Sequence, residues 1–465
     1  MARTPRECDV IVVGAGVAGL SSAIFLRRSG LDVLVLDPLP SPGGASFGNA
    51  GLISAGSMTP MALPGMARQV PGWLRDPLGP LAVRPSYLPK AAPWLARWIK
   101  AGRKKRVVEV SHGLRALHRN AFEDWRDLLG SAAFADLIRR GGQVQIWSQA
   151  EETPTAAIER ELRAIHGVES HVLSREELRQ IYPGIGEEAR RGLLMPGNGH
   201  TVSPPRLLRA MADIFRQEGG DIRPERAMKL WREGEIWTAM TNAANHRARH
   251  VVVAAGAWSN RLLEPLGLGL PLESERGYHA ALARPALEMR YPILHKSGGF
   301  GLTMLEDGLR VAGTVEIGGL DAAPDERRAR VLIERARRLF PDLRHEGETL
   351  WMGHRPSMPD SLPALGPVER FPGLHLCFGH GHYGMTAGPS SGRLVARALR
   401  GDAQPPKYGP YGPPLFPGGQ TPGGGSQRPG TSTPACPPRA AASCSGRRPS
   451  PRPSCSRARR WRPAR

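Results

Sequence analysis

The sequence predicts an α/β fold, and three observations in its first forty residues carry this prediction. Val10–Val13 is a short apolar, β-branched run of the kind that forms a buried parallel strand. A turn with glycines at positions 14, 16 and 19 follows directly and opens a helical stretch from Val17 to Ser29. This stretch leads to Val33–Leu36, a second buried strand that ends at Asp37.

The glycine spacing GxGxxG, in this context, predicts a Rossmann-like unit that binds a dinucleotide. Gly14 permits the tight turn, Gly16 lets a pyrophosphate approach the backbone, and Gly19 lets helix and strand pack closely. The N-terminus of the helix offers free N–H groups and the positive end of its dipole to that pyrophosphate. Asp37 follows Gly19 by 18 residues, where an acidic side chain binds ribose hydroxyls and disfavours a 2′-phosphate. The alternative is an ordinary glycine-rich turn, which the order of elements disfavours.

Composition and charge narrow the classes of function. The chain has 465 residues, 40% of them hydrophobic, which is enough for a large core and two or three structural units. A net charge of +21 would suit a protein that binds nucleic acid or an anionic membrane, but ten arginines and no acidic residue lie in residues 417–465. This segment is rich in Pro, Gly and Arg, and we expect a disordered tail, either an extension or the product of a frameshift. We therefore expect no nucleic-acid partner.

Cysteine usage and hydropathy predict a cytoplasmic protein. Only Cys8 and Cys377 precede the tail, which is too few for a disulfide framework. The N-terminal residues show no secretory pattern, and no run of apolar residues is long enough to span a membrane. No spacing among the histidines suggests a metal site.

The segment from Met58 to Arg106 differs in character from its surroundings. Eight prolines interrupt it, Trp94 and Trp98 lie in its second half, and a basic cluster closes it. One interpretation is peripheral binding to the anionic inner face of the plasma membrane. The other, which the frequent prolines favour, is a pair of helices packed over the substrate site.

The remaining patterns predict a second domain of α+β type, mainly an antiparallel sheet, inserted into the first. Helical periodicity covers residues 111–138 and 326–340, and Ser174 begins a capping box. Alternating patterns at 271–284, 299–304 and 309–314 predict antiparallel strands. We expect residues 1–60, 200–262 and 345–412 to form the nucleotide-binding domain. Residues 61–199 and 263–344 would form the substrate domain.

The last organised stretch predicts a loop, a strand, a glycine turn and a helix. Arg355 is expected in a loop between two strand-like runs, and Leu374–Phe378 is expected to be a strand. The turn GHGHYGMT at 379–386 then leads to a helix from Ser390 to Leu399.

At this point the chain resembles the D-amino-acid oxidase superfamily of flavoproteins, and most closely its bacterial D-amino-acid dehydrogenase branch of the small-subunit type. Four motifs match in order over residues 8–410: VVGAGVAGLSSA, SFGNAGLIS, GHRPSMPDSLPALG and GHGHYGMT. His382, Tyr383 and Met385 depart from the residues common in that branch, which leaves the substrate open.

The resemblance implies FAD as the cofactor and a position for each of its parts. Adenosine and pyrophosphate would lie along the first turn, the isoalloxazine and ribityl chain beside the second motif, and the N1–C2 edge of the flavin at the fourth. The expected cofactor-binding residues are Gly14, Ala15, Gly16, Val17, Ala18, Gly19, Asp37, Pro38, Ser46, Gly48, Asn49, Ala50, Gly51, Leu52, Ala255, Gly256, Gly381, His382, Tyr383, Gly384, Met385 and Thr386.

The resemblance also implies a substrate anchor. Arg355 matches the family arginine that pairs with the substrate carboxylate, Tyr278 falls on a position that often carries a substrate-facing aromatic residue, and His354 adjoins Arg355. A bidentate arginine–carboxylate pair would orient the substrate for hydride transfer from Cα to flavin N5. The positive end of a helix starting near Thr386 would lie by the ring. The alternatives are a structural salt bridge for Arg355, a core position for Tyr278 and structural roles for four histidines: His200, His354, His380 and His382.

The expected function is therefore FAD-dependent oxidation of a D-amino acid to the imino acid, which yields a 2-oxo acid and ammonia. Electrons would pass to a quinone or another acceptor. One alternative is an oxidase of glycine, sarcosine or another secondary amine that uses oxygen. Another is a basic nucleic-acid-binding protein with a vestigial nucleotide fold.

Overall fold

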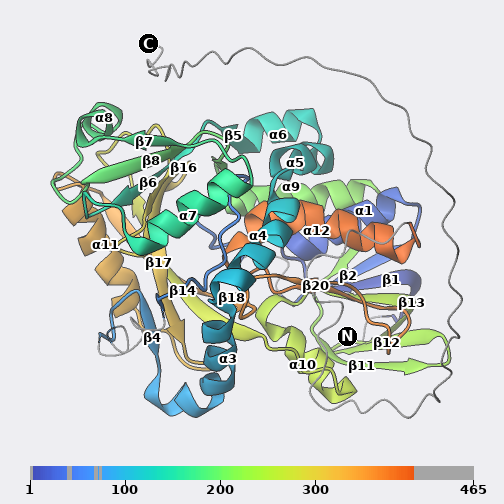
Figure 1. Ribbon diagram of the computed structural model, residues 1–465. Helices are drawn as coiled ribbons and strands as arrows, with labels where there is room; N and C mark the ends of the chain where they lie inside the picture. Colours follow the sequence, from blue (N-terminus) through green and yellow to red (C-terminus); the bar gives the residue numbers. More distant parts are fainter. Residues whose placement is uncertain (1–3, 39–43, 67–71, 73–75, 403–465) are drawn as a thin grey trace, which may run out of the picture. The chain divides into compact units, whose positions relative to one another are not determined.

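A mixed sheet of eight strands carries the glycine turn at the end of its strand β1 (Figure 1). The computed structural model describes residues 4–38, 44–66, 72 and 76–402. Strand order is β10-β2-β1-β13-β12-β11, with β20 beside β13 and β19 beside β20. These strands are β1 (Glu7–Val13), β2 (Val33–Leu36), β10 (Asp221–Arg223), β11 (Ala227–Glu233), β12 (Ile236–Thr241), β13 (Asn245–Val253), β19 (Ala364–Pro367) and β20 (Leu374–Phe378).

The parallel half of this sheet confirms the strands predicted from apolar runs. Strand β1 lies between β2 and β13, with Val10 opposite Val33 on one side and His250 on the other. Strand β10 pairs in parallel with β2, so the chain does return to the first sheet after residue 200, as predicted. The four residues of β2 are all buried, as expected for a parallel strand covered on both faces.

Helices cover one face of the parallel strands (Figure 1). On the other face, side chains of β1 and β2 share an apolar core with those of α10 and of the antiparallel strands β11 and β12. The helices on the first face are α1 (Val17–Arg28), α5 (Ala121–Leu129), α6 (Ser131–Leu137), α9 (Pro204–Gln217) and α12 (Gly384–Leu399). Helix α10 (Ser259–Leu263) is on the second. Helix α12 begins before the predicted Ser390, because its glycines serve packing and do not form a turn. A Cβ at Gly388 would lie 2.4 Å from Val17 Cγ1 of α1, and one at Gly392 would lie 2.5 Å from Ser21 C.

A second, nine-stranded sheet is mainly antiparallel, as predicted, in the order β18-β14-β17-β16-β15-β6-β8-β7, with β4 beside β17. Helices α8 and α11 contribute to the apolar core on it. Its strands are β4 (Leu81–Val83), β6 (Gln143–Trp147), β7 (His171–Leu173), β8 (Arg191–Met195), β14 (Glu273–Ala283), β15 (Ile293–His295), β16 (Phe300–Leu305), β17 (Gly308–Ile317) and β18 (Gly347–Ser357). A small third sheet joins β3 (Leu52–Ile53), β9 (Gly199–Thr201) and β5 (Ile138–Arg140).

The prediction that Arg355 lies in a loop is wrong. It belongs to β18, which pairs over its whole length with β14. The glycine and proline that suggested a loop are compatible with this strand because β18 is at the edge of the sheet. An edge strand tolerates Pro356, since one row of its N–H groups needs no partner strand.

The helical stretch predicted for residues 111–138 is divided in the structure. Helix α4 (Lys104–His118) ends before Asn120, and Gly130, with a φ of 77°, separates α5 from α6. A positive φ interrupts a right-handed helix, and the apolar periodicity does not report it. Helix α8 (Arg175–Ile181) begins at the capping box predicted on Ser174, and helix α11 (Arg327–Leu339) is close to the predicted 326–340. Helix α7 covers Pro154–Ile165.

The segment with frequent prolines contains helix α3 (Leu88–Ala101) and only the start of α4, which continues beyond the segment to His118, so the pair of helices predicted within it is found in part. Trp94 and Trp98 of α3 are buried. Among the described residues, no helix has the length and apolarity required to cross a membrane. The chain divides after Pro417, and the predicted tail at 417–465 lies outside the described residues.

Candidate active site

The turn after β1 is tight enough that two of its positions accept only glycine. Gly14 has a φ of 114°, and a Cβ there would lie 2.4 Å from the carbonyl oxygen of Ala254. A Cβ at Gly19 would lie 1.9 Å from the carbonyl oxygen of Gly14. Helix α1 therefore begins directly beside the ends of β1 and β13, with extended Gly16 at its N-cap. Its first N–H groups lie at the C-terminal edge of the parallel strands, where anionic ligands bind such sheets.

Two predicted side chains reach this turn from later segments. Asp37, just after β2, accepts a hydrogen bond from the Ala15 amide at 2.6 Å. Ser46 Oγ accepts one from the Val17 amide at 3.1 Å. Gly256, with a φ of 56°, follows β13 at the same edge. The structure thus brings the first turn, Asp37 and Gly256, which were predicted for adenosine and pyrophosphate, to one edge of the sheet. Ser46, predicted to flank the ribityl chain and flavin, lies at the same turn.

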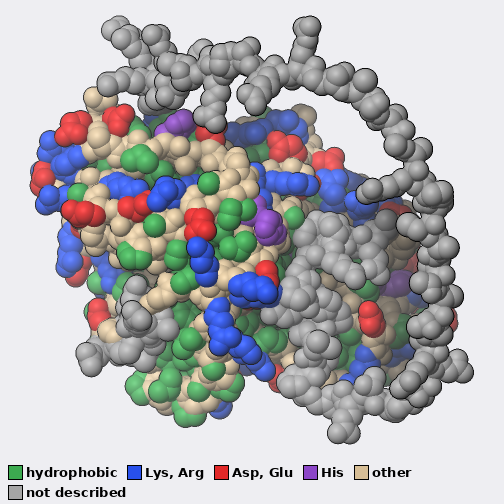
Figure 2. Space-filling model, viewed as in Figure 1, with side chains coloured by type: hydrophobic (Ala, Val, Ile, Leu, Met, Phe, Trp, Pro, Cys, Tyr) green, Lys and Arg blue, Asp and Glu red, His purple; other side chains and the backbone are tan. Residues whose placement is uncertain are grey.

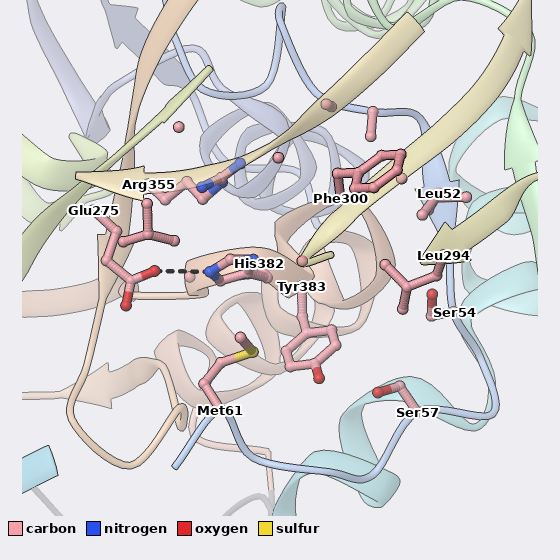
Figure 3. A pocket seen from close by; sticks show the side chains of 18 of the residues that line it. Leu52, Ser54, Ser57, Met61, Glu275, Leu294, Phe300, Arg355, His382 and Tyr383 are labelled. Carbon is pink, nitrogen blue, oxygen red and sulfur yellow. Dashed lines mark hydrogen bonds and ion pairs between the residues drawn. The ribbon is translucent and has the colours of Figure 1, made fainter. Parts of the chain in front are cut away.

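A cavity of about 530 Å³ lies between the second motif, the second sheet and the turn before α12 (Figure 3). Its lining includes these predicted residues: Gly48, Asn49, Ala50, Leu52, Tyr278, Arg355, Gly381, His382, Tyr383 and Thr386. The other predicted residues do not line it: Gly14, Ala15, Gly16, Val17, Ala18, Gly19, Asp37, Pro38, Ser46, Gly51, Ala255, Gly256, His354, Gly384 and Met385.

Arg355 projects into this cavity from β18, and three features of the second sheet fix its position. Its side chain lies over Gly277 of β14, where a Cβ would come within 2.1 Å of Arg355 Cζ. Its Nη1 donates a hydrogen bond to the carbonyl oxygen of Thr314 at 3.0 Å. Buried Thr314 has a φ of 50° and lies where the β14–β17 register shifts, so local backbone strain directs this carbonyl.

Glu275 balances the charge beside Arg355. It is opposite Arg355 in the β14–β18 register, and its Oε2 lies 2.7 Å from His382 Nε2 (Figure 3). Burial favours the neutral carboxyl, but the hydrogen bond from His382 and the charges of His382 and Arg355 outweigh it, so the pKa of Glu275 lies below its ordinary value. Burial lowers the pKa of the Arg355 guanidinium, and the charge of Glu275 opposes this effect.

Side chains of the second sheet hold the loop of the second motif. His279 Nδ1 donates to the carbonyl oxygen of Gly48 at 2.9 Å, and Arg310 Nη1 donates to that of Asn49 at 2.9 Å. The ring of Trp351 stacks on His279 with centroids 4.9 Å apart, and a Cβ at Gly48 would lie 2.4 Å from that ring. Burial lowers the pKa of His279 to about 3, so the ring is neutral.

Two of the residues predicted to contact substrate have other partners. The hydroxyl of Tyr278 donates to Glu316 Oε2 at 2.6 Å and accepts from the Asp325 amide at 3.2 Å. His354 Nδ1 lies 2.8 Å from Ser274 Oγ. Since successive side chains of a strand alternate in direction, His354 is on the other face of β18 from Arg355.

The turn before α12 faces the cavity. The Tyr383 hydroxyl donates to the carbonyl oxygen of Thr59 at 2.7 Å, and Thr386 Oγ1 accepts from the Ser54 amide at 2.9 Å. Helix α12 begins at Gly384, so its N-terminal end, with the positive end of its dipole, adjoins the cavity.

A sequence profile of the family described as FAD dependent oxidoreductase (DAO) matches residues 9–398. The chain belongs to this family. The oxidoreductase is 36% identical over 421 residues to a D-amino-acid oxidase of Bradyrhizobium diazoefficiens, with 89% of this chain and 100% of the relative covered. It is 30% identical over 397 residues to a D-amino acid dehydrogenase of Xylella fastidiosa, with 83% and 91% covered. The crystal structure of glycine oxidase from Geobacillus kaustophilus shares its fold, with a TM-score of 0.63, 21% identity, and 85% and 95% of the chains covered.

The cofactor of the oxidoreductase is FAD. The turn fits its pyrophosphate because Gly14 and Gly19, where a side chain would collide with backbone, let the chain turn tightly at the edge where α1 begins.

Several residues that line the cavity or hold its walls were not predicted from the sequence: Glu275, Gly277, His279, Arg310, Thr314 and Trp351. One signal was available for three of them. Glu275, Gly277 and His279 alternate along a predicted strand, and this spacing places all three on one face. Tyr278, which was predicted to face the substrate, lies between them in the strand.

Proposed function

We propose that this oxidoreductase converts a D-amino acid to the corresponding imino acid, which water then hydrolyses to a 2-oxo acid and ammonia. One observation carries the proposal: the guanidinium of Arg355 enters a cavity walled by the second motif and the turn before α12. A buried guanidinium beside a small-molecule cavity matches the planar carboxylate of an amino acid. The names of the two relatives, D-amino-acid oxidase and D-amino acid dehydrogenase, support the same chemistry.

We propose that FAD binds to the residues that the sequence predicted for it. The first turn, Asp37 and Gly256 would hold the adenosine and pyrophosphate. The Ser46–Leu52 loop and the Gly381–Thr386 turn would flank the flavin. FAD supplies the two-electron acceptor for the hydride that leaves Cα.

The chain's own groups orient the substrate. Arg355 binds the carboxylate, and Gly277 and Thr314 restrict where the guanidinium lies. Orientation of this kind lowers the barrier by holding the reacting atoms in place before reaction. The N-terminal end of α12 stabilises negative charge that develops beside it.

We propose the domain division predicted from the sequence, with one change. Because β18 (Gly347–Ser357) pairs along its length with β14, residues 345–357 go with the substrate domain. The nucleotide-binding domain then comprises residues 1–60, 200–262 and 358–412, with residues 61–199 and 263–357 as the substrate domain.

We propose a membrane quinone as the electron acceptor. Residues 77–108 contain eight basic and no acidic residues, and basic side chains gather over α3 and α4 (Figure 2). Leu88 and Ile99 of α3 are 41% and 47% exposed. A basic helix with exposed apolar side chains suits the surface of an anionic bilayer, while Trp94 and Trp98 on its buried face line the cavity. Oxygen is the alternative acceptor, favoured by the name of the relative that is 36% identical.

Anaerobic mixing of the purified holoenzyme with paired D- and L-amino acids tests the reaction. We expect D-amino acids, and not their L-enantiomers, to bleach the flavin absorbance. Bleaching by glycine or sarcosine alone would replace the proposal with an oxidase of glycine or of a secondary amine. Reoxidation by a quinone analogue, compared with peroxide formation in air, then decides the acceptor.

A further inference from the structure

One face of helix α7 contributes charged side chains to the cavity wall. Thr155, Glu159 and Arg163 are spaced by four residues, which places them on the same face, and all three line the cavity. Glu159 is 4% exposed and Arg163 is 8% exposed, so the helix carries two buried ionisable groups here. Buried charges of this kind need partners.

Glu159 has such a partner, and Arg163 does not. The Glu159 carboxylate binds Lys296 Nζ at 2.6 Å. Within the described residues, the Arg163 guanidinium has no hydrogen bond and no ion pair within 4 Å. Burial lowers the pKa of Arg163, which the charge of Glu159 opposes, and an arginine remains protonated at neutral pH. A buried, unpaired guanidinium on a cavity wall is suited to an anion from solution.

Gln143 of β6 adds a second unused donor to the same cavity. Its side chain is 2% exposed, and its Oε1 accepts a hydrogen bond from Asn198 Nδ2 at 2.8 Å. The amide nitrogen, Nε2, is buried and has no partner among the described residues.

This group of residues belongs to the same cavity as Arg355. Tyr383, in the turn before α12, lines it as well, and so do the apolar side chains of Leu294 and Phe300 (Figure 3). Burial raises the pKa of the Tyr383 hydroxyl. One cavity thus contains a guanidinium for the α-carboxylate and a second, unpaired guanidinium.

We propose that Arg163 binds a second anionic group on the substrate, so that the enzyme prefers acidic D-amino acids to their uncharged isosteres. This inference rests on the proposed function. The Glu159–Lys296 pair leaves Arg163 as the cation available to the ligand, since Lys296 is already neutralised.

The test compares D-glutamate with D-glutamine, and D-aspartate with D-asparagine, by the rate constant of anaerobic flavin reduction divided by the apparent Kd. We expect the acidic member of each pair to be favoured at least tenfold. In Arg163→Met the preference should fall to about onefold, and in Arg163→Lys part of it should return. Arg160→Met, on the exposed side of the same helix, is the matched control and should keep the preference.

A second measurement does not depend on turnover. Glutarate should raise the Tm of the holoenzyme more than butyrate does, and Arg163→Met should abolish the difference. Equal use of D-glutamate and D-glutamine, or a preference that survives Arg163→Met, would overturn the inference while the proposed function stands. If no amino acid bleaches the flavin but glutarate stabilises through Arg163, the proposed function fails and the anion site remains.

Discussion

Gly277 leaves the space that the guanidinium of Arg355 occupies, since a Cβ at that position would lie 2.1 Å from Arg355 Cζ. The two residues belong to adjacent strands, β14 and β18, and are 78 positions apart in the chain. The cavity wall therefore depends on a missing side chain on one strand as much as on the long side chain of the other.

Gly277→Ala should displace Arg355 and weaken substrate binding. We expect the apparent Kd for D-amino acids to rise at least tenfold, with FAD content unchanged, because the new methyl group occupies the guanidinium's place. Anaerobic flavin titration measures this Kd. Gly347→Ala, in β18 with no atom within 4 Å of the added Cβ, is the control and should match the wild type. An unchanged Kd in Gly277→Ala would show that Arg355 does not anchor the substrate from this position.

Arg355→Leu should lower kcat/KM for D-amino acids by about a hundredfold or more, as expected when one partner of a buried charge pair is removed. The matching amine without a carboxylate should be used equally poorly by the variant and the wild type. Steady-state kinetics with a dye acceptor gives both values. If the variant loses activity equally on both substrates, Arg355 has a structural role instead.

Gly16→Ala and Gly14→Ala should have different consequences. A Cβ at Gly16 meets only Ser46 Oγ, at 3.2 Å, so the variant should fold, but the methyl group should weaken FAD binding at least tenfold. Gly14→Ala collides with backbone at a φ of 114° and should reduce the amount of folded protein. Fluorescence titration of the apoprotein and circular dichroism separate the two effects. FAD binding to Gly16→Ala with the wild-type Kd would argue against the pyrophosphate site.

His118 should make the protein less stable in mild acid. It is fully buried beside Tyr383, and burial is the main reason that its pKa is lowered from 6.5 to about 4. Between these pH values the unfolded chain binds a proton that the folded chain does not. The free energy of unfolding should therefore fall by about 3 kcal/mol through this residue as the pH drops from 6.5 to 4, and no further below that.

Denaturant unfolding of His118→Asn across this pH range checks the prediction. Asparagine keeps a donor for the carbonyl oxygen of Ser57, which accepts from His118 Nδ1 at 2.9 Å, and removes the titration. The pH dependence should become shallower. A slope that does not change in His118→Asn would contradict the assignment.

Local patterns predicted much of the fold. The strands at Val33–Leu36 and Leu374–Phe378 and the capping box at Ser174 match the structure because each depends on neighbouring residues alone. The motif identified Arg355 but predicted a loop around it, because glycine and proline are typical of loops. Only the structure shows that this stretch is an edge strand, where a proline is tolerated. Arg163 was not identified, since an arginine on an amphipathic helix has the same pattern whether it faces solvent or a cavity.

The sequence by itself determined the glycine turn after β1, since strand, glycines, helix and acid are contiguous and their geometry follows from backbone sterics. Tertiary structure alone decided the cavity. The strand register places Glu275 opposite Arg355, and the bulge at Thr314 directs a carbonyl oxygen to the guanidinium. The packing of α7 places Arg163 on the cavity wall. These contacts join segments far apart in the chain, and their energy depends on burial, which no local pattern records.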